Sequence, residues 1–367
     1  MVVHSVRNLS DYIAALIRTG GPLTVARYMS EALNHPKWGY YARRNPLGSS
    51  GDFITAPEIS QMFGELVTAW LIDCWVKMGR PDPAIVVELG PGRGTFISDL
   101  WRVARMVPSF SRAIKLCLVE TSPVLREQQR QKLELIGCSG EVTWVESFEE
   151  VPEMPMLLIA NEFFDALPVH QYVRFRGKWR ERLVDIDPKS DHSFRYILNL
   201  QTTSIPSMGD DERCFLDALE VCPIGVLLAS RIGERLSRFP GAALIIDYAS
   251  AHPGLSFQAV RAHSSVNPLI SPGDSDLSCA VDFKVLGQAA GVAGAKVYGP
   301  VPQGSFLRSL GIEQRAATLI KEANPKTACA VSQSKNRLIE PEFMGQSFNS
   351  LAISSPDIRM VEGFDVK

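Results

Sequence analysis

The sequence lacks several features that mark common classes of protein. Its seven cysteines are odd in number and scattered, and none forms a C-x-x-C pair, which argues against a disulfide framework and a cysteine zinc site. The formal net charge is only -2, so composition gives no sign of a surface that binds nucleic acid. No run approaches the roughly eighteen apolar residues of a membrane span. We expect a protein of a reducing compartment without membrane insertion.

Familiar catalytic motifs are also missing. The chain offers no Ser-His-Asp set, no G-x-S-x-G elbow and no Walker loop. The histidines lack the H-x-x-x-H spacing typical of metal sites; they are His4, His35, His170, His192, His252 and His263. The sequence therefore predicts neither a covalent nucleophile of these classes nor a bound metal.

Short apolar runs alternate with helical patterns from about residue 84. The strand-like runs are AIVVELG, KLCLVE, EVTWVE, MLLIANEFF and ALIIDYA, and helical spacing follows the first two of them, over residues 96–104 and 123–136. Strands that alternate with helices imply right-handed crossovers and a mostly parallel sheet covered on both faces. The fold class predicted is a doubly wound α/β core.

Other stretches extend this core. The N-terminus reads as two helices, HQYVRFRGKWRERLVDID and SFRYILNL predict an inserted antiparallel unit, and the tail offers a last edge strand. The Gly-, Pro- and Ser-rich segment after Tyr248 is predicted to be an ordered functional loop. Four segments result: 1–80, a helical segment with a lid; 81–169, the ligand-binding core; 170–240, the insertion; and 241–367, which completes the sheet.

A glycine-rich turn follows the first strand of the core. In VVELGPGRGTF, Gly90, Gly92 and Gly94 stand between a strand and a helix, where the backbone turns sharply and a ligand can approach it. A dinucleotide fingerprint needs G-x-G-x-x-G, but position 95 is threonine. G-x-G-x-G after a strand that carries an acid is the pattern of S-adenosyl-L-methionine (SAM) sites, and Glu88 is that acid. The alternative is a glycine turn without a ligand.

The next two strands end in further candidate residues. Glu120 follows KLCLVE, where a carboxylate can accept hydrogen bonds from both hydroxyls of a ribose; alternatively it only supports the next helix N-terminus. Ser147 and Phe148 follow EVTWVE. The Phe148 ring is predicted either to lie on adenine or to be part of the core.

Polar residues end the fourth strand. In LIANEFFDALP, Asn161 and Glu162 interrupt an apolar run and Asp165 follows. Ligands bind at this carboxyl edge of a parallel sheet, and charged residues seldom lie beside buried strands without a partner. We expect Asn161 near the cofactor, with a solvated loop as the alternative.

An N-terminal segment, GDFITAPEISQMFGEL, combines a glycine turn with a strong helix signal. Thr55 and Glu58 have capping-box spacing, and apolar residues follow at helical intervals, so one helix is predicted from about Ala56. It is either a core helix or the fixed side of a lid over the ligand. In a lid, Gly51, Asp52, Thr55, Pro57 and Glu58 approach the ligand.

These motifs together resemble the MidA-like family of SAM-dependent methyltransferases. The resemblance rests on GDFITAPEISQMFGE, VVELGPGRGTF, LVETSP, ANEFFDALPVHQ, IIDYA, PLISPGDSDLSCAVDF and QGSFLRSLGIEQRA, and extends from about residue 10 to residue 355. It implies a Rossmann-like methyltransferase fold, SAM as cofactor, and methylation of an arginine on a partner protein. For the mitochondrial member, the partner implied is a respiratory complex I subunit. The location implied is cytoplasmic for a bacterial member and the mitochondrial matrix for a eukaryotic one.

The same resemblance suggests catalytic roles. Residues 161–164, Asn-Glu-Phe-Phe, resemble the motif with which protein arginine methyltransferases present a glutamate to the substrate, which makes Glu162 the candidate acceptor-binding residue. Asp165 and His170 are weaker candidates for taking up the released proton.

The sequence departs from the family pattern at two positions. Ala249 follows Asp247-Tyr248 where a glycine is usual, and Ala280 precedes Val281-Asp282-Phe283 where a histidine is usual. These departures leave open a SAM-binding assembly chaperone with little catalysis. The glycine loop leaves open a second alternative, a nicotinamide-dependent oxidoreductase that tolerates Thr95 in its phosphate loop.

Overall fold

The computed structural model describes residues 6–43, 54–138, 142–190, 193–201, 216–250, 254–358 and 362–364. The chain divides into two compact units. The core unit contains the described residues of 54–164, 225–249 and 281–367, and the accessory unit those of 1–53, 165–224 and 250–280. Compared with the four predicted segments, residues 54–80 join the core, and the N-terminal helices join the inserted strands.

The core unit is built on a seven-stranded sheet in the order β14-β15-β10-β5-β2-β3-β4. Five of these strands run parallel, and β15 pairs antiparallel with both β10 and β14. The parallel strands are β2 (Ala84–Leu89), β3 (Ile114–Val119), β4 (Val142–Val145), β5 (Met156–Asn161) and β10 (Gly241–Tyr248). These are the five runs that the sequence predicted, so the doubly wound α/β core is confirmed.

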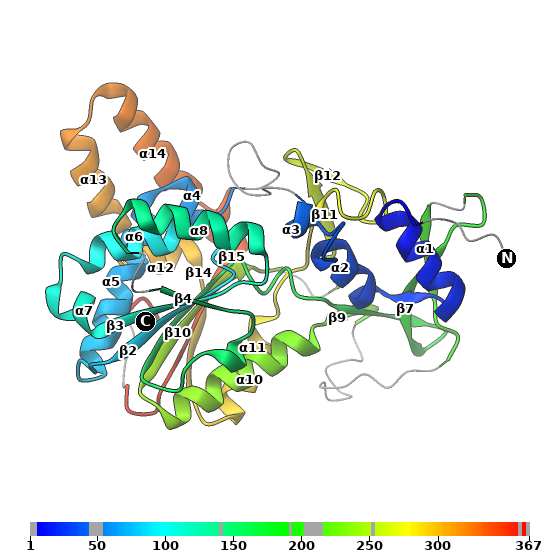
Figure 1. Ribbon diagram of the computed structural model, residues 1–367, viewed down its shortest axis with the longest axis horizontal. Helices are drawn as coiled ribbons and strands as arrows, with labels where there is room; N and C mark the ends of the chain where they lie inside the picture. Colours follow the sequence, from blue (N-terminus) through cyan, green and yellow to red (C-terminus); the bar gives the residue numbers. More distant parts are fainter. Residues whose placement is uncertain are drawn as a thin grey trace. The chain divides into compact units, whose positions relative to one another are not determined.

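Helices cover both faces of this sheet, as Figure 1 shows: α6 and α8 lie on one face, and α10 and α11 on the other. Consequently β2 is buried along its whole length, which explains why its sequence is continuously apolar apart from Glu88. The helical elements of the core unit are α4 (Ala56–Ile59), α5 (Gln61–Lys77), α6 (Thr95–Ala104), α7 (Pro108–Ala113), α8 (Pro123–Leu135), the 3₁₀ turn Phe148–Glu150, α10 (Pro223–Arg238), α11 (Phe283–Val292), α12 (Gln303–Ser309), α13 (Ile312–Glu322), α14 (Pro325–Ile339) and α15 (Met344–Ser347).

The predicted last edge strand exists, but its predicted place at an edge was wrong. β15 (Phe348–Ser354) lies between β10 and β14 (Lys296–Pro302), so β14 is the edge strand. The sequence did not reveal β14, because its pairing is interrupted by a bulge between Tyr298 and Val301. Gly299 and Pro300 occupy that bulge, and both residue types are unfavourable inside a strand.

The helix predicted from Ala56 is in fact two helices. α4 begins at Ala56 as expected, but the Thr55 side chain makes no capping hydrogen bond, so the predicted capping box is wrong. The chain becomes extended at Ser60, whose side chain accepts a hydrogen bond from the Met62 N–H at 3.2 Å and caps α5. The break turns α4 into a separate short segment.

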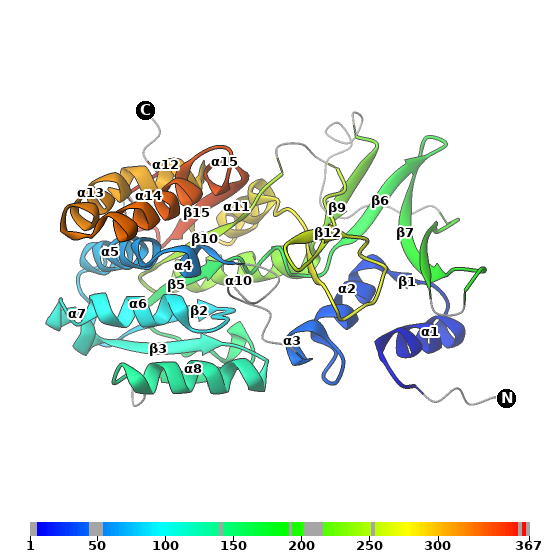
Figure 2. The same ribbon diagram turned by 90° about the horizontal axis from the view of Figure 1, so that it is seen from above.

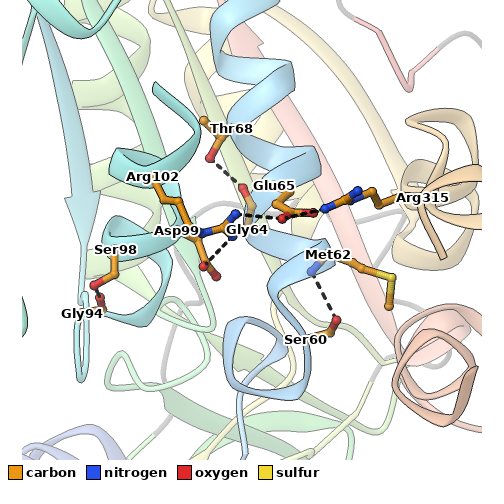
Figure 3. Close-up of polar contacts among 10 residues, drawn as sticks. All are labelled: Ser60, Met62, Gly64, Glu65, Thr68, Gly94, Ser98, Asp99, Arg102 and Arg315. Carbon is orange, nitrogen blue, oxygen red and sulfur yellow. Dashed lines mark hydrogen bonds and ion pairs between the residues drawn. The ribbon is translucent and has the colours of Figure 1, made fainter. Parts of the chain in front are cut away.

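Close packing at Gly64 joins α5 to α6, as Figure 3 shows. A Cβ atom at Gly64 would lie only 2.6 Å from the Asp99 Cβ, so a side chain there would push the helices apart. Beside this contact the Glu65 carboxylate accepts hydrogen bonds from Arg102 at 2.9 Å and from Arg315 of α13 at 2.7 Å. The ion pairs join α5, α6 and α13.

The accessory unit contains the inserted strands and the N-terminal helices (Figure 2). A five-stranded sheet has the order β1-β7-β6-β9, with β8 also pairing with β7, and a second sheet has the order β12-β11-β13. The strands are β1 (Leu23–Thr24), β6 (His170–Phe175), β7 (Lys178–Ile186), β8 (Phe194–Leu198), β9 (Ala218–Val221), β11 (Gln258–Arg261), β12 (Ser264–Val266) and β13 (Asp276–Ser278). The helices are α1 (Leu9–Gly20), α2 (Val25–Asn34) and α3 (Tyr40–Arg43). The predicted hairpin around Arg176-Gly177 and the two predicted N-terminal helices are confirmed.

The accessory unit has its own hydrophobic core. Ile13 of α1 and Tyr28 of α2 are fully buried there with Val184 of β7. The Tyr28 hydroxyl donates a hydrogen bond to the Pro268 carbonyl at 2.7 Å, which connects α2 to the segment predicted to be an ordered loop. Among the residues described, none of the helices in either unit is both long and apolar enough to cross a membrane.

Candidate active site

The strand order of the core sheet reverses between β2 and β5, because β3 and β4 follow on one side and β10 on the other. At such a point two neighbouring strands send their connections in opposite directions, which opens a crevice at the carboxyl edge. The glycine loop, residues 90–94, leaves β2 there, and the NEFF loop, residues 161–164, leaves β5.

Three glycines give the glycine loop its shape. Gly90, Gly92 and Gly94 have φ values of +62°, +52° and +71°, a region that side chains disfavour and glycine adopts freely. Space is also short, since a Cβ at Gly90 would lie 2.7 Å from the Phe163 ring. Gly94 is the N-cap of α6. The loop therefore brings bare backbone to the start of a helix, as predicted.

Glu88 lies near the end of β2 and is 4% exposed. Burial raises its pKa to about 8, Lys132 opposes the rise and Glu120 adds to it. Its Oε2 atom has no hydrogen-bond partner within the described parts of the chain. A buried acceptor without a donor is costly, so this oxygen fits the cationic or amino group of a ligand.

Glu120 directly follows β3, and its carboxylate accepts hydrogen bonds from neighbouring groups. Oε1 accepts the Ser122 N–H at 2.8 Å, and Oε2 accepts the Gln129 amide at 3.3 Å. Burial raises its pKa, whereas these hydrogen bonds lower it. The contact with the Ser122 N–H supports the start of α8, which agrees with the alternative that Glu120 supports the next helix N-terminus. A carboxylate has about four acceptor positions, so binding of a ribose stays compatible with this geometry.

Gln129 is a residue that the sequence reasoning missed. It is fully buried on α8, its amide donates to the Gly92 carbonyl at 2.7 Å, and its Oε1 accepts the Trp144 indole N–H at 2.8 Å. With the Glu120 contact, Gln129 thus joins the glycine loop to the ends of β3 and β4. The available signal was its spacing, because Gln129 lies midway between the buried Leu125 and Leu133 on the apolar side of α8.

The residues that follow β4 have local partners. The Ser147 hydroxyl is 3.1 Å from the Glu150 carboxylate. Phe148 is 5% exposed, and its ring lies 5.1 Å from the guanidinium carbon of Arg235. This packing fits the core alternative for Phe148, and contact with adenine stays a prediction.

Glu162 is the centre of the NEFF loop. Its backbone has a φ of +52°, which is uncommon for a residue with a side chain and frequent at functional sites. The carboxylate Oε1 accepts the Ala56 N–H at 2.7 Å and the Asn161 amide at 3.1 Å. Neither Glu162 Oε2 nor Asn161 Oδ1 has a hydrogen-bond partner in the described parts of the chain.

The charge environment of Glu162 is negative. Burial raises its pKa to about 8; the Ala56 hydrogen bond opposes the rise, whereas Asp247 and Glu58 add to it. The charged groups with the largest effects on Glu162 are thus both acidic. Such a carboxylate becomes ionised most readily when a cation binds beside it.

α4 lies against both loops. Its first N–H, of Ala56, donates a hydrogen bond to the Glu162 carboxylate. The Glu58 carboxylate lies 3.5 Å from the Arg93 guanidinium of the glycine loop. Thr55 accepts the Glu58 N–H through its backbone carbonyl at 2.9 Å, and Pro57 is buried. Gly51 and Asp52 lie outside the described residues. The structure thus brings Thr55, Pro57 and Glu58 to the same edge as the two loops.

Asp165 and His170 belong to the accessory unit. The Asp165 carbonyl accepts the Cys279 N–H at 2.9 Å. His170 lies on β6 with its Nδ1 atom 2.6 Å from the Glu181 carboxylate, and its ring stacks on Tyr172. Their roles in proton uptake stay predictions.

Comparison with known proteins identifies the family. Residues 66–301 match a family described as S-adenosyl-L-methionine-dependent methyltransferases. The protein named protein arginine methyltransferase NDUFAF7, mitochondrial, of Xenopus laevis is 36% identical over 378 residues, which cover 95% of this chain and 85% of the relative. The chain belongs to the MidA-like family of SAM-dependent methyltransferases.

Further members of this family carry the same name. The human protein is 36% identical and covers 92% of this chain, with 81% of its own length matched. The Drosophila melanogaster homologue is 38% identical, with coverages of 94% and 84%. A crystal structure from Burkholderia thailandensis with S-adenosyl-homocysteine bound shares the fold, with a TM-score of 0.81, 23% identity, and coverages of 98% and 95%.

SAM is the cofactor of this family, and the residues at the carboxyl edge fit it. The glycine loop offers a bare backbone turn, and Glu88 and Asn161 each have a buried oxygen without a donor among the described residues. The register pairs Glu88 with Ile159, so Asn161, two residues further along β5, leaves the sheet on the same face as Glu88. Donor groups of one ligand can therefore meet both oxygens.

Proposed function

We propose that this methyltransferase transfers a methyl group to an arginine side chain of a partner protein, and that Glu162 binds the guanidinium. The observation that carries the proposal is the Glu162 carboxylate, whose buried Oε2 atom has no hydrogen-bond partner among the residues that the structure describes, beside two further acids. A guanidinium supplies positive charge and several N–H donors in one plane, which is what this environment lacks. The names of the relatives, protein arginine methyltransferases, agree with that acceptor.

Residues of the crevice would hold the cofactor as follows. Glu88 binds the amino or cationic group, the glycine loop lies along the ligand backbone, Glu120 accepts the ribose hydroxyls and Asn161 contributes an amide. Bound SAM supplies an electrophilic methyl group. Transfer is an in-line displacement, so the protein chiefly aligns the nucleophile and excludes water.

Glu162 has two tasks in this scheme. It pairs with two guanidinium N–H groups and leaves the third nitrogen directed at the methyl group. It also draws the positive charge away from that nitrogen, which matters because the guanidinium, with a pKa above about 12, is almost never neutral at pH 7. Asp165 or His170 takes up the proton that the product releases, and a complex I subunit is the partner that the family resemblance suggests.

The substitution Glu162→Gln tests this assignment. Gln keeps an oxygen for the Ala56 N–H but has no charge for the guanidinium, so we expect SAM affinity within a few-fold of wild type and methyl transfer reduced by orders of magnitude. The acceptor is an extract of source cells from which the gene has been deleted, incubated with methyl-labelled SAM. Acid hydrolysis then identifies the methylated amino acid.

The matched control is Glu65→Gln. The Glu65 carboxylate belongs to the same unit and its side chain is 10% exposed, but it pairs with Arg102 and Arg315 and is not part of the NEFF loop. This variant should methylate the extract at the wild-type rate. Normal methylation by the Glu162 variant, or label recovered in methyllysine or a methyl ester, would show that the guanidinium mechanism is wrong.

An assembly chaperone is the second candidate, since Ala249 and Ala280 replace the usual residues. Both backbone N–H groups are satisfied, by the Ser347 carbonyl at 2.8 Å and the Ser256 hydroxyl at 2.8 Å. The substitutions therefore leave an ordered backbone at both positions. Under the chaperone hypothesis the extract would acquire no label from the wild-type protein.

The cellular location also belongs to this proposal. The named relatives are mitochondrial, and the matrix of a eukaryote or the cytoplasm of a bacterium is the expected compartment for this chain.

A further inference from the structure

We propose that Asp247 is a positioning residue for methyl transfer, which holds the NEFF loop so that the Glu162 carboxylate faces the acceptor. This inference rests on the proposed function of Glu162. Asp247 lies near the end of β10 and its side chain is fully buried. In the sequence analysis IIDYA served only as a family motif, and no role was assigned to its aspartate.

The carboxylate of Asp247 accepts backbone hydrogen bonds from the neighbouring loop. Its Oδ2 atom accepts the N–H of Phe163 at 3.0 Å and that of Phe164 at 2.8 Å. The preceding N–H, of Glu162, donates to the Ile246 carbonyl at 2.8 Å. Three consecutive amides of the NEFF loop are therefore held by two consecutive residues of β10.

This pattern explains how Glu162 keeps its unusual backbone. Ladder pairing between β5 and β10 ends at Asn161 and Ile246, and one residue later the chain adopts a φ of +52°. A left-handed residue with a side chain persists only where the surroundings determine it. The Asp247 carboxylate supplies that constraint, because it replaces the strand partner that Phe163 and Phe164 lose on leaving the sheet.

The same contacts connect the two loops of the site. Since the Phe163 N–H is held by Asp247, the Phe163 ring is directed against the glycine loop, where it lies 2.7 Å from the Cβ position of Gly90. Only glycine leaves room for this approach. Asp247 thus sets the distance between the loop that binds the cofactor and the residue that binds the acceptor.

Asp247 also acts on Glu162 by charge. Besides burial, the groups that shift the pKa of Glu162 are Asp247 of β10 and Glu58 of α4, which raise it, and hydrogen bonds from Ala56 and Asn161, which lower it. Replacing Asp247 by Asn removes one negative charge and lowers the pKa of Glu162. If ionised Glu162 binds the guanidinium, the methylation rate rises with pH as Glu162 loses its proton. In Asp247→Asn this rise, the acid limb of the pH–rate profile, then occurs at lower pH than in wild type.

The test is Asp247→Asn in the extract assay at saturating SAM. In the wild type Oδ2 accepts the two loop N–H groups, and Oδ1 accepts the Tyr248 N–H at 2.8 Å. Asn has only one acceptor oxygen, so its NH2 group must face N–H donors on one of these two sides. We expect methyl incorporation to fall at least 30-fold (about 2 kcal/mol at RT of ~0.6 kcal/mol) with SAM affinity within a few-fold of wild type. The acid limb should lie at lower pH than in wild type. If Asp247→Asn only made the protein fold less well, the methylation rate would fall at every pH and the acid limb of the pH–rate profile would not move. That outcome would overturn the proposal.

A double variant tests whether Asp247 acts through Glu162. In the Glu162→Gln background, Asp247→Asn should cause little further loss, because residues that act as a unit are not additive. A full additional loss would overturn the positioning role. Glu65→Gln again serves as the control with wild-type rate and limb.

Two outcomes separate this inference from the proposed function. Wild-type methylation by Glu162→Gln refutes the guanidinium mechanism and this inference with it, whereas an inactive Glu162→Gln with a fully active Asp247→Asn refutes only the role of Asp247. Should Asp247→Asn fail to fold, hydrogen exchange in the wild-type protein decides. The Phe163 and Phe164 amides must exchange slowly, and exchange as fast as in exposed loops would refute the clamp.

Discussion

The guanidinium of Arg93 lies 3.5 Å from the carboxylate of Glu58 and so connects the glycine loop to α4. Glu58 is 10% exposed in its side chain and Arg93 is 38% exposed, and burial raises the pKa of Glu58 while Arg93 and Lys132 lower it. Only one side of the pair meets solvent freely. Its main effect is geometric, because it fixes α4 against the glycine loop.

The first prediction concerns closure of this segment. If α4 is the fixed side of a lid, amides of residues 54–59 should exchange faster in the free protein than with SAM or S-adenosyl-homocysteine. Glu58→Gln should reduce this ligand-dependent protection because the pair with Arg93 is lost. Hydrogen exchange followed by mass spectrometry measures both. Equal exchange with and without ligand would return α4 to the role of an ordinary core helix.

The second prediction concerns the glycine loop. Gly92→Val places a branched side chain where backbone and ligand should meet, at a φ of +52°, and should remove most of the SAM affinity while the protein stays folded. Calorimetry measures the affinity. Gly137→Val is the matched control, since Gly137 also has a positive φ, +73°, but no atom lies within 4 Å of its Cβ position.

The control separates backbone strain from contact with the ligand. Both variants should unfold at lower temperatures than wild type, and only Gly92→Val should bind SAM poorly. Unchanged SAM affinity in Gly92→Val would remove the assignment of the loop. Glu120→Gln should weaken binding less, by roughly 1 to 3 kcal/mol, if charge-assisted hydrogen bonds to the ribose are lost.

The strands that form the parallel part of the sheet were predictable because burial on both faces leaves a continuous apolar run. The same reasoning placed Glu88 and Glu162 at the carboxyl edge, because a charged residue seldom lies in or beside a buried apolar run without a partner. β14 escaped prediction because Gly299 and Pro300 interrupt it, and an edge strand tolerates them. Interior β15 contains the fully buried Ser350 and Ser354, so its sequence resembles that of an exposed edge.

Contacts between distant residues could not be predicted from local pattern. Thr55 and Glu58 have the spacing of a capping box, yet the first N–H of α4 bonds Glu162, more than a hundred positions away. Asp247 reaches Phe163 and Phe164 across 84 and 83 positions. Local spacing predicts whether a segment can form a helix. The tertiary fold determines which acceptor the N–H groups at the start of that helix bind.

The third prediction concerns protons. Burial raises the pKa of Glu88 to about 8, so at about pH 7 most free protein carries a neutral Glu88. A bound cationic group lowers that pKa, and SAM binding should therefore release protons. Calorimetry in two buffers of different ionisation enthalpy measures the number released. Glu88→Gln should release fewer protons, and equal release would exclude Glu88 as their source.

The same shift fixes a pH dependence of stability. A carboxyl whose pKa is raised in the folded state binds more protons there, so its contribution to stability is lost as pH rises from about 4.3, the unfolded value, toward about 8. Near pH 8, ligand-free Glu88→Gln should thus unfold at a higher temperature than ligand-free wild type. Near pH 4 this advantage should vanish, as thermal unfolding at the two pH values can show.

The fourth prediction concerns Gln129, which joins the Gly92 carbonyl, the Glu120 carboxylate and the Trp144 indole. Gln129→Leu keeps the volume but leaves the half-buried carbonyl and indole N–H without these partners, at a cost of about 1–3 kcal/mol in the free energy of unfolding. SAM affinity should fall as well, because Gly92 and Glu120 lose the side chain that they share. Urea unfolding and calorimetry measure the two effects.

A neighbouring residue provides the control for Gln129. Gln131 lies on the same helix, is exposed, and bonds only the Glu127 carboxylate, at 2.8 Å, among the hydrogen bonds described for its side chain. Gln131→Leu makes the same chemical change at the surface and should alter stability by no more than about 0.5 kcal/mol, with normal SAM affinity. If Gln129→Leu matched this control in both measurements, the buried amide would be dispensable, and the other contacts of the glycine loop, with the NEFF loop and α4, would be enough to hold it.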